Sequence, residues 1–412
     1  MEPKLIDHLF RHHYGKMVSV LVRIFGLAHL ETIEDAIQDT FIKASTSWKN
    51  NPPEHPEAWL TKAAKNRVLD VFRKLKAEHK RIPDITSGTE AIAIQELFLD
   101  NEIEDSQLRM IFTACHPQLN PKDRISFALK TVSGFSSKEI AAALLTKEET
   151  IKKRLSRARV SIQKGNISFE IPQGKALSER LNSAMEVLYL IFNEGFHSTK
   201  KEMLVRKELC AEAMRLCKML LTHKSTQTPK IYALFALMCF HAARIESKTN
   251  HQNELLDLRD QDRSLWHFPL IKLGNTAMHK AVEDTSFSSY HYEAAIAAEH
   301  LKAATFEKTN WKTILKWYEC LYELNPTPIH ILNMAVVQLQ DGRFRESYQL
   351  LQQLDPETLG QRTYLYHATL SDYYLTQKEY PNAITHIDIA LRLVTNKQEK
   401  NYLEKKRISL IL

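Results

Sequence analysis

The chain has 412 residues and a formal net charge of +7, and 44% of its residues are hydrophobic and 25% charged. This length exceeds what one compact core usually holds, so we expect two to four domains of ordinary globular character. No apolar stretch reaches the roughly 18 residues of a membrane span, and no N-terminal segment resembles a signal peptide. The five cysteines have neither the spacing of a zinc site nor the even number of a disulfide framework. These features predict a cytoplasmic protein without a membrane span, metal or cofactor.

The scarcity of turn-forming residues, with 10 Gly and 14 Pro, and the lack of strand-like alternation predict an all-α fold. Three stretches interrupt the helical pattern, residues 50–57, 81–90 and 165–179, and each contains proline. We therefore expect residues 1–80 as one helical domain, 81–105 as a linker, 106–165 as a second helical domain, and 178–412 as a long helical extension.

A helix with one acidic side is expected in the first domain, where residues 34–48 read EDAIQDTFIKASTSW. Ile37, Phe41 and Ala44 recur at helical spacing and form its buried stripe. Acidic groups repel nucleic-acid phosphates, so this side favours a basic protein partner over DNA. A plainly solvated helix face is the alternative. The polar residues concerned are Glu34, Asp35, Gln38 and Asp39.

A proline-rich loop, residues 49–56, separates this helix from a basic one. The basic helix offers Lys62, Asn66, Arg67 and Arg73, which suit phosphates and a separated DNA strand. The rings of Trp48, Trp59 and Phe72 suit either stacking on unpaired bases or, as we favour, the hydrophobic core.

A helix–turn–helix pattern follows in residues 134–163, which read GFSSKEIAAALLTKEETIKKRLSRARVSIQ. Ser136 and Glu139 predict a capping box at the start of its first helix. The buried face of its second helix comprises Ile151, Leu155, Ala158 and Ile162. The opposite, basic face comprises Lys152, Lys153, Ser156, Arg157 and Arg159. This face suits the major groove of DNA, and a solvated basic face is the alternative.

Two degenerate repeats near the C-terminus, residues 331–356 and 367–395, each predict a helix, a turn and a second helix. In the later repeat Leu370, Tyr374, Ala383 and Ala390 fall where a tetratricopeptide repeat has its packing residues, and Ser371 replaces the usual glycine. Stacked helical hairpins are therefore the expected, tetratricopeptide-like architecture of the extension.

Several motifs together resemble the extracytoplasmic-function sigma factors, the small promoter-recognition subunits of bacterial RNA polymerase. Residues 34–48 with 56–74 resemble region 2 of that family, and residues 108–163, with LRMIFTACHPQL, GFSSKEIA and TIKKRLSRAR, resemble region 4. VLYLIFNEGFH at 187–197, DQDRSLW at 260–266 and the terminal repeats resemble the helical extension of one sigma-factor group.

The resemblance implies two partners, core RNA polymerase and promoter DNA, and a role for each domain. The acidic residues Glu34, Asp35, Gln38 and Asp39 would dock on the polymerase. Region 2 would recognise and melt the minus-ten element, and its loop would hold a flipped-out base. The minus-ten residues would be Lys49, Asn50, Asn51, His55, Lys62, Asn66, Arg67 and Arg73. The basic face of the helix–turn–helix, Lys152 to Arg159, would read the minus-thirty-five element.

Two other functions are alternatives to a sigma factor. A stand-alone helix–turn–helix regulator with a tetratricopeptide-like sensor leaves the acidic helix and the proline loop unexplained. An enzyme in the extension would use polar residues there, but the metalloprotease, serine-hydrolase and phosphate-loop motifs are absent from the sequence. We expect no enzyme, and interpret DQDRSLW as a salt-bridged turn that anchors Trp266. The polar residues concerned are Glu194, His197, Asp260, Asp262, Arg263 and His267.

The extension is expected to be regulatory, with a soluble regulator or a small-molecule signal as its partner. Its connection to region 4 is short, so we expect residues 178–412 to pack against residues 106–165. An independent module on a free linker is the alternative. Gly195 is expected to end the helix that carries FNEGF.

Overall fold

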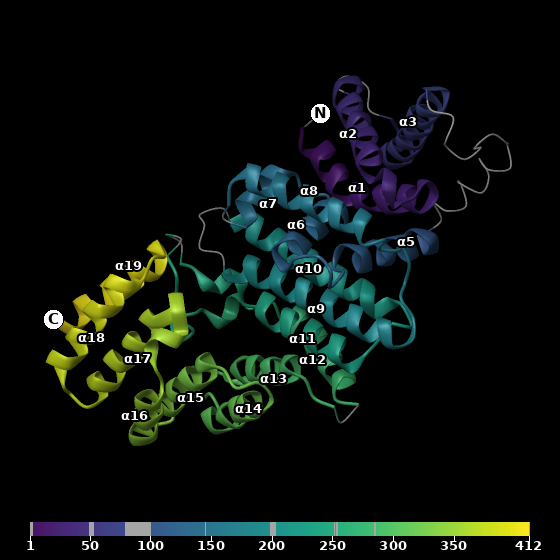
Figure 1. Cartoon of the computed structure of the whole chain (residues 1–412). Helices are drawn as coiled ribbons and strands as arrows, with labels where there is room; N and C mark the ends of the chain where they lie inside the picture. Colours follow the sequence, from purple (N-terminus) through teal and green to yellow (C-terminus); the bar gives the residue numbers. More distant parts are fainter. Residues whose placement is uncertain are drawn as a thin grey trace. The chain divides into compact units, whose positions relative to one another are not determined.

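The computed structural model describes residues 3–48, 53–78, 100–144, 146–197, 203–250, 252, 254–283 and 286–411. Within them every regular element is a helix, and one isolated bridge joins Thr249 to Leu255 (Figure 1). The all-α prediction is confirmed. The chain divides into two compact units, Met1–Glu194 (unit 1) and Gly195–Leu412 (unit 2).

The first helical bundle of unit 1 corresponds to the predicted acidic and basic helices. It comprises α1 (Pro3–Phe25), the 3₁₀ turn η1 (Leu27–His29), α2 (Leu30–Ser47) and α3 (Pro56–Glu78). The predicted stripe Ile37, Phe41 and Ala44 is at most 4% exposed and lies in the core, as expected. Trp48 and Phe72 are also buried, and the Phe72 ring stacks on Phe25 with 4.5 Å between centroids. These two aromatic rings therefore belong to the core.

The second bundle of unit 1 contains the helix–turn–helix. It comprises α5 (Asp100–Ala114), α6 (Pro121–Thr131), α7 (Ser137–Ala143) and α8 (Glu148–Lys164). The predicted capping box is confirmed: the Glu139 amide donates to Ser136 Oγ (3.2 Å), and the Ser136 amide donates to Glu139 Oε2 (2.8 Å). The predicted apolar face of α8 is buried as expected. Most of the expected linker lies outside the described residues, and α5 begins within its last part.

The two bundles pack on each other inside unit 1 through α1, which contacts both α5 and α6. Gly15 permits this approach, because a Cβ atom built there would lie 1.9 Å from the carbonyl oxygen of Val132. At the end of α1, Arg23 Nη1 lies 2.7 Å from Glu102 and 3.1 Å from Asp105 on α5. A small residue and a pair of ion pairs thus join the two predicted DNA-reading domains.

A long helix, α9 (Gly174–His197), begins in unit 1 and is hydrogen-bonded to the second bundle. Arg124 on α6 donates to Ser183 Oγ (2.7 Å), and Ser183 Oγ donates to the carbonyl of Cys115 (2.5 Å). Arg180 donates to the carbonyl of Phe112 (2.8 Å). The expectation that Gly195 ends this helix was wrong, because the helix continues to His197. Intact helical hydrogen bonding outweighs the weak helix propensity of one glycine.

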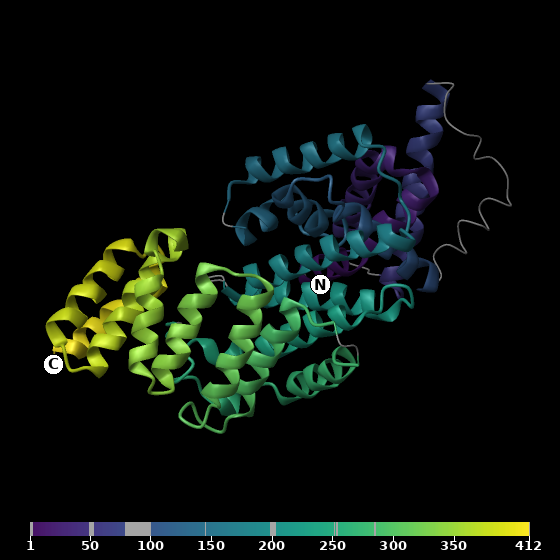
Figure 2. The ribbon, with the colours of Figure 1, turned by 60° about the horizontal axis from the view of Figure 1, so that its bottom comes forward.

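Unit 2 is a succession of helices in which neighbours along the chain pack together; Figures 1 and 2 show α15 to α19 lying side by side. Its α-helices are α10 (Met203–Thr222), α11 (Pro229–Ala242), α12 (Phe268–Ala281), α13 (Ser289–Lys302), α14 (Trp311–Leu324), α15 (Pro328–Gln340), α16 (Phe344–Gln353), α17 (Thr363–Thr376), α18 (Tyr380–Leu393) and α19 (Lys397–Ile411). Three 3₁₀ segments, η2 (Ile245–Lys248), η3 (Arg263–Leu265) and η4 (Pro356–Arg362), lie between them. None of the described helices in either unit has the length and apolarity needed to cross a membrane.

The two C-terminal repeats form the helical hairpins α15–α16 and α17–α18. Leu370, Ala383 and Ala390 are buried between helices, at most 6% exposed. Ser371, which replaces the repeat's usual glycine, is 1% exposed and donates from Oγ to the carbonyl of Ala383 (2.8 Å). The small hydroxyl therefore permits close helix packing and also forms a hydrogen bond across the hairpin.

Candidate functional site

The predicted acidic helix α2 places its first functional residue, Glu34, in the interior of unit 1. Its side chain is 2% exposed and accepts two hydrogen bonds from groups far away in the sequence. Tyr14 on α1 donates its hydroxyl to Oε1 (2.9 Å), and Arg159 on α8 donates from Nη2 to Oε2 (2.5 Å). One residue of the expected polymerase-binding set is therefore held by one residue of the expected DNA-reading set.

Burial and charge act against each other at this junction. Burial alone lowers the pKa of Arg159, but the charge and hydrogen bond of Glu34 and the charge of Glu31 leave that pKa above its usual value. Burial, then the charge of Glu34, raises the pKa of the Tyr14 phenol well above its usual value. Lys130 lies 5.0 Å from the centre of the Tyr14 ring, and burial lowers its pKa. The phenol of Tyr14 and the guanidinium of Arg159 thus both donate to the buried carboxylate of Glu34.

The rest of the acidic set faces outward. Asp35 is exposed, and its pKa is raised by partial burial and by the charges of Glu31 and Glu34. Asp39 is also exposed and forms an ion pair with Arg67 on α3 (2.7 Å). Gln38 is half-buried. The outer side of α2 therefore remains acidic although Glu34 is withdrawn from it.

The basic helix α3 presents its expected residues on the surface. Lys62, Asn66, Arg67 and Arg73 are all exposed, and Arg73 forms an ion pair with Asp70 (3.3 Å). A cavity of about 650 Å³ between α2 and α3 is lined by Asp39, Thr40, Lys43, Trp59, Lys62, Ala63, Asn66, Arg67 and Asp70. His55 is exposed beside the start of α3, whereas Lys49, Asn50 and Asn51 lie outside the described residues.

The predicted recognition helix α8 keeps part of its basic face open to solvent. Lys153 and Ser156 are exposed, and Lys152 pairs with Glu148 one turn earlier (3.0 Å). Arg157 makes two hydrogen bonds to the buried carboxylate of Asp123 (3.1 and 2.8 Å), and these raise its pKa. Arg157 is still 62% exposed, so its outer edge remains accessible.

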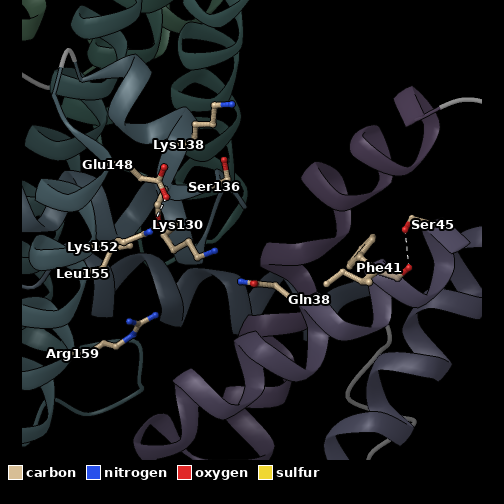
Figure 3. A pocket seen from close by; sticks show the side chains of 12 residues that line it. Gln38, Phe41, Ser45, Lys130, Ser136, Lys138, Glu148, Lys152, Leu155 and Arg159 are labelled. Carbon is tan, nitrogen blue, oxygen red and sulfur yellow. Dashed lines mark hydrogen bonds and ion pairs between the residues drawn. The ribbon is translucent and has the colours of Figure 1, made fainter.

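A cavity of about 560 Å³ opens between the acidic helix and the helix–turn–helix within unit 1 (Figure 3). Figure 3 shows Gln38 and Phe41 on one side, and Lys130, Lys152 and Arg159 on the other. Its lining is Gln38, Phe41, Ile42, Ser45, Lys130, Ser136, Ser137, Lys138, Glu148, Lys152, Leu155 and Arg159. The structure thus gathers residues expected at two different interfaces around one space.

Three residues of this arrangement did not emerge from the sequence. Tyr14, Asp123 and Lys130 are buried at the junction or behind α8. Each stands in a run of ordinary helical residues, so no local pattern distinguishes it. Only the fold shows that they hold Glu34 and Arg157 in place.

Three of the six polar residues considered for an enzyme, Asp262, Arg263 and His267, have structural partners. Asp262 accepts from the Ser264 amide (2.8 Å), His267 Nδ1 accepts from the Leu270 amide (3.3 Å) at the start of α12, and Arg263 donates to two backbone carbonyls. Burial raises the pKa of Glu194. The turn at 260–266 does anchor Trp266, which is 5% exposed, but with hydrogen bonds and the Arg263 guanidinium over the ring.

Comparison with known proteins places both bundles in one family. Residues 9–78 match the family model described as Sigma-70 region 2, and residues 109–162 match that described as Sigma-70, region 4. An uncharacterized protein of Rhizobium meliloti (strain 1021) is 32% identical over 397 residues, which cover 94% of this chain and 91% of that protein. The ECF RNA polymerase sigma factor SigE of Mycolicibacterium smegmatis is 28% identical over 165 residues, 38% of this chain and 60% of SigE. The chain belongs to the extracytoplasmic-function sigma factors.

This sigma factor carries a long C-terminal extension. Residues 180–282 match a family of unknown function, DUF6596. The ferric citrate uptake sigma factor FecI of Escherichia coli (strain K12) is 26% identical over 152 residues, 37% of this chain and 85% of FecI. Most of this sigma factor therefore lies outside its matches to SigE and FecI. No solved structure is significantly similar to the chain. The region 2 match removes the stand-alone helix–turn–helix regulator from consideration.

Proposed function

We propose that this sigma factor docks on core RNA polymerase with the acidic side of α2 and reads promoter DNA with α3 and α8. The observation that carries the proposal is one exposed acidic surface and two exposed basic surfaces on separate bundles of unit 1. Opposite charges steer the acidic surface to a basic protein and the basic surfaces to phosphates. The polymerase supplies the chemistry, so this chain acts as a binding protein in the cytoplasm and not as an enzyme.

Within region 2, residues 1–80, Asp35, Gln38 and Asp39 contact the polymerase. Glu34 supports them from inside the unit, because its carboxylate is 2% exposed. Lys62, Asn66, Arg67 and Arg73 contact the minus-ten DNA, together with His55 and the loop residues Lys49, Asn50 and Asn51. The cavity between α2 and α3 has a size typical of small-molecule sites, roughly 300–1,000 Å³, and receives an unstacked base.

Within region 4, residues 106–165, Lys152, Lys153, Ser156 and Arg157 contact the minus-thirty-five element. Arg159 joins them only after α8 separates from α2, since its guanidinium donates to Glu34 in the packed form. Polymerase binding supplies the free energy for this separation. The linker at 81–105 then lets regions 2 and 4 reach two promoter elements at once.

The extension, residues 178–412, regulates this step in response to a small-molecule signal or a soluble regulator. Helix α9 offers the physical connection, because its first half packs on α5 and α6 of region 4 and its last residues, Gly195 to His197, belong to unit 2. A change around those last residues alters the strain on one continuous helix.

Polymerase binding is tested with a double charge reversal, Asp35→Lys and Asp39→Lys, in a quantitative pull-down of core polymerase. We expect the affinity to fall by at least tenfold, because two attractive contacts become repulsive. The matched control is Glu319→Lys with Glu323→Lys, an exposed acidic pair one turn apart on α14. Equal affinities for the α2 double variant and the wild type would remove α2 from the interface.

DNA reading is tested by gel shift with polymerase holoenzyme and the variants Lys153→Ala and Lys152→Ala. A lost base contact costs about 1–3 kcal/mol and relaxes specificity, whereas a lost phosphate contact weakens all sequences alike and flattens the salt dependence. If both variants bind all sequences with the affinity and salt dependence of the wild type, the basic face of α8 is merely solvated.

A further inference from the structure

Unit 2 contains a cavity of about 480 Å³. Its walls come from the last turn of α9, from residues 241–248 and 255–258, and from α17 and α19. Among the lining residues are Phe196, Arg244, Lys248, Tyr364, Tyr402 and Leu403. This volume lies within the roughly 300–1,000 Å³ of typical small-molecule sites. The lining combines apolar and aromatic side chains with six charged ones.

Arg244 is the unusual group in this cavity. Its Nε and Nη2 donate to the amide oxygen of Gln261 (3.3 and 3.1 Å), and no carboxylate of the described residues forms an ion pair with its guanidinium. Gln261 is 7% exposed and donates to the carbonyl of Leu256 (3.4 Å). The guanidinium is thus held by a neutral acceptor, and its Nη1 donates to no described group.

A second guanidinium adds positive charge beside the first. Arg263 lies 4.5 Å and Arg244 lies 6.0 Å from the ring centre of Trp266, whose indole N–H donates to Ser247 (3.0 Å). Arg263 donates from Nη1 to the carbonyls of His300 (3.0 Å) and Ala303 (2.8 Å). Its Nη2 atom is buried and has no hydrogen-bond partner. The guanidinium groups of Arg244 and Arg263 therefore lie near the same indole ring, and the acceptors of their hydrogen bonds are neutral.

The clustered positive charges lower the pKa of two groups, Arg244 and His300. Burial and the charge of Arg263 lower the pKa of Arg244 to about 10. Burial and the charges of both arginines lower the pKa of His300 to about 4. A buried cation without an anion is costly, and a fold that needed only packing would be served by an apolar side chain at this position.

The acids around the cavity already have partners of their own. Asp372 pairs with Lys406 (2.5 Å), and Asp257 accepts from the Tyr402 hydroxyl (3.0 Å). Glu399 accepts from the hydroxyl of Tyr364. Asp257 is the acid whose charge reaches Arg244, but it lies beyond ion-pair distance. The lining therefore holds three cations and three acids, but none of these acids lies within ion-pair distance of Arg244, whose guanidinium stays available to a group that enters the cavity.

We propose that this cavity binds a small organic anion, whose carboxylate or phosphate head meets Arg244 and whose apolar body lies against Leu255, Leu365 and Leu403. Guanidinium groups bind both kinds of head through paired, charge-assisted hydrogen bonds. The tyrosines and leucines of the lining offer apolar surface to the body of such a ligand. Inorganic anions fill too little of the cavity to bind well.

The cavity also includes Phe196, in the last turn of α9, whose carbonyl accepts from Lys248 (2.5 Å). A ligand in the cavity therefore touches the helix whose first half packs on region 4. That its occupancy regulates promoter binding rests on the proposed function. The existence of the site rests on the geometry of unit 2 alone.

Calorimetric titration of the full chain without polymerase tests the site independently of sigma activity. The probes are 3-phenylpropionate and phenyl phosphate, with 3-phenylpropionamide and inorganic phosphate as matched compounds that lack the charge or the apolar body. We expect the better of the two aromatic anions to bind at least about tenfold more tightly than the amide and than inorganic phosphate. No binding of either aromatic anion at millimolar concentration, or equal binding of the amide, overturns the proposal.

Two variants assign that binding to Arg244. Arg244→Met should lower the affinity for the aromatic anion at least about tenfold. Arg244→Lys keeps the charge but loses the planar guanidinium, so its affinity should lie between those of Arg244→Met and the wild type. The control Arg345→Met removes an exposed arginine of α16 and should change nothing. Unchanged binding in Arg244→Met contradicts the proposal.

Thermal melting without ligand distinguishes a binding role from a structural one. If Arg244 is kept for a ligand, Arg244→Met should melt no lower than wild type, because a costly buried charge is removed. A melting temperature lowered by several degrees in both Arg244→Met and Arg244→Lys would instead assign Arg244 a structural role and overturn the proposal.

Discussion

Glu34 in unit 1 and Arg244 in unit 2 are both charged groups withdrawn from solvent, but their neighbours differ. Glu34 accepts hydrogen bonds from the Tyr14 phenol and the Arg159 guanidinium, both within unit 1. Arg244 meets a neutral amide and lies beside another arginine. The hydrogen bonds of Glu34 join two helical bundles, whereas the guanidinium of Arg244 remains available to pair with an anionic ligand.

This difference separates two ways of using a buried charge. Removing one partner of a buried ion pair strongly destabilises the protein, because the remaining charge is left without a partner. A charge without an oppositely charged partner lowers the stability of the free protein, and a ligand that pairs with it restores that stability.

The largest effect is expected for Arg159→Met, which strands the carboxylate of Glu34. We predict a loss of about 3 kcal/mol in the stability of unit 1, at the lower end for buried pairs because Arg159 remains partly exposed. Hydrogen exchange reports the two units separately and is the measurement of choice. Lys153→Met, an exposed change on the same helix, is the control and should cost less than about 0.5 kcal/mol.

The double variant Glu34→Gln with Arg159→Met sharpens the interpretation. It should recover part of that loss, because the stranded charge is gone. Additive losses from the two changes would show that Glu34 and Arg159 act independently and do not link the two bundles.

A smaller loss is expected from Gly15→Ala, which attacks the same junction through packing. The new Cβ would lie 1.9 Å from a backbone oxygen, so α1 must move away from α6 at a cost of about 2 kcal/mol. The equivalent change in unit 2, Gly274→Ala, meets the Phe240 ring at 2.6 Å, and a side chain yields more easily than backbone. Equal losses in the two variants would mean that the α1 junction is no more rigid than a helical hairpin.

Acid should destabilise unit 2 through His300, whose pKa is about 4 in the folded state. A lowered folded pKa means that its contribution is present above about pH 6.5, the unfolded value, and is lost as the pH falls toward 4. From pH 7 to pH 5 we expect unit 2 of wild type to lose roughly 1 kcal/mol more than that of His300→Gln, after allowing for partial exposure. Parallel pH profiles for the two proteins would contradict the depressed pKa.

The smallest effect concerns the two terminal hairpins. The α15–α16 turn has Gly342 at φ 76°, whereas the α17–α18 turn has Lys378 at φ 61°. Replacing Lys378 with Gly should stabilise unit 2 by about 0.5 kcal/mol, because the relieved strain exceeds the added entropy of the unfolded chain. Urea denaturation of Lys378→Gly beside Lys378→Ala checks this, and a destabilised glycine variant would contradict it.

Local patterns in the sequence predict much of this molecule. The Ser136–Glu139 capping box, the buried faces of α2 and α8, and the terminal hairpins follow from spacing alone, since each depends on residues within one or two turns. The contact between Glu34 and Arg159 does not, because it joins residues 125 positions apart. The approach of Arg244 and Arg263 to the same Trp266 ring could not be predicted either, because the segment between them has no helical periodicity.

Run-off transcription with purified core polymerase, on promoter DNA selected by the holoenzyme itself, tests the central claim most directly. The full chain should give a transcript with a defined start, the Asp35→Lys, Asp39→Lys variant should lose it, and the Glu319→Lys, Glu323→Lys control should keep it. A transcript that is independent of this chain, or equal with the α2 variant, would contradict its assignment as the promoter-directing subunit acting through α2.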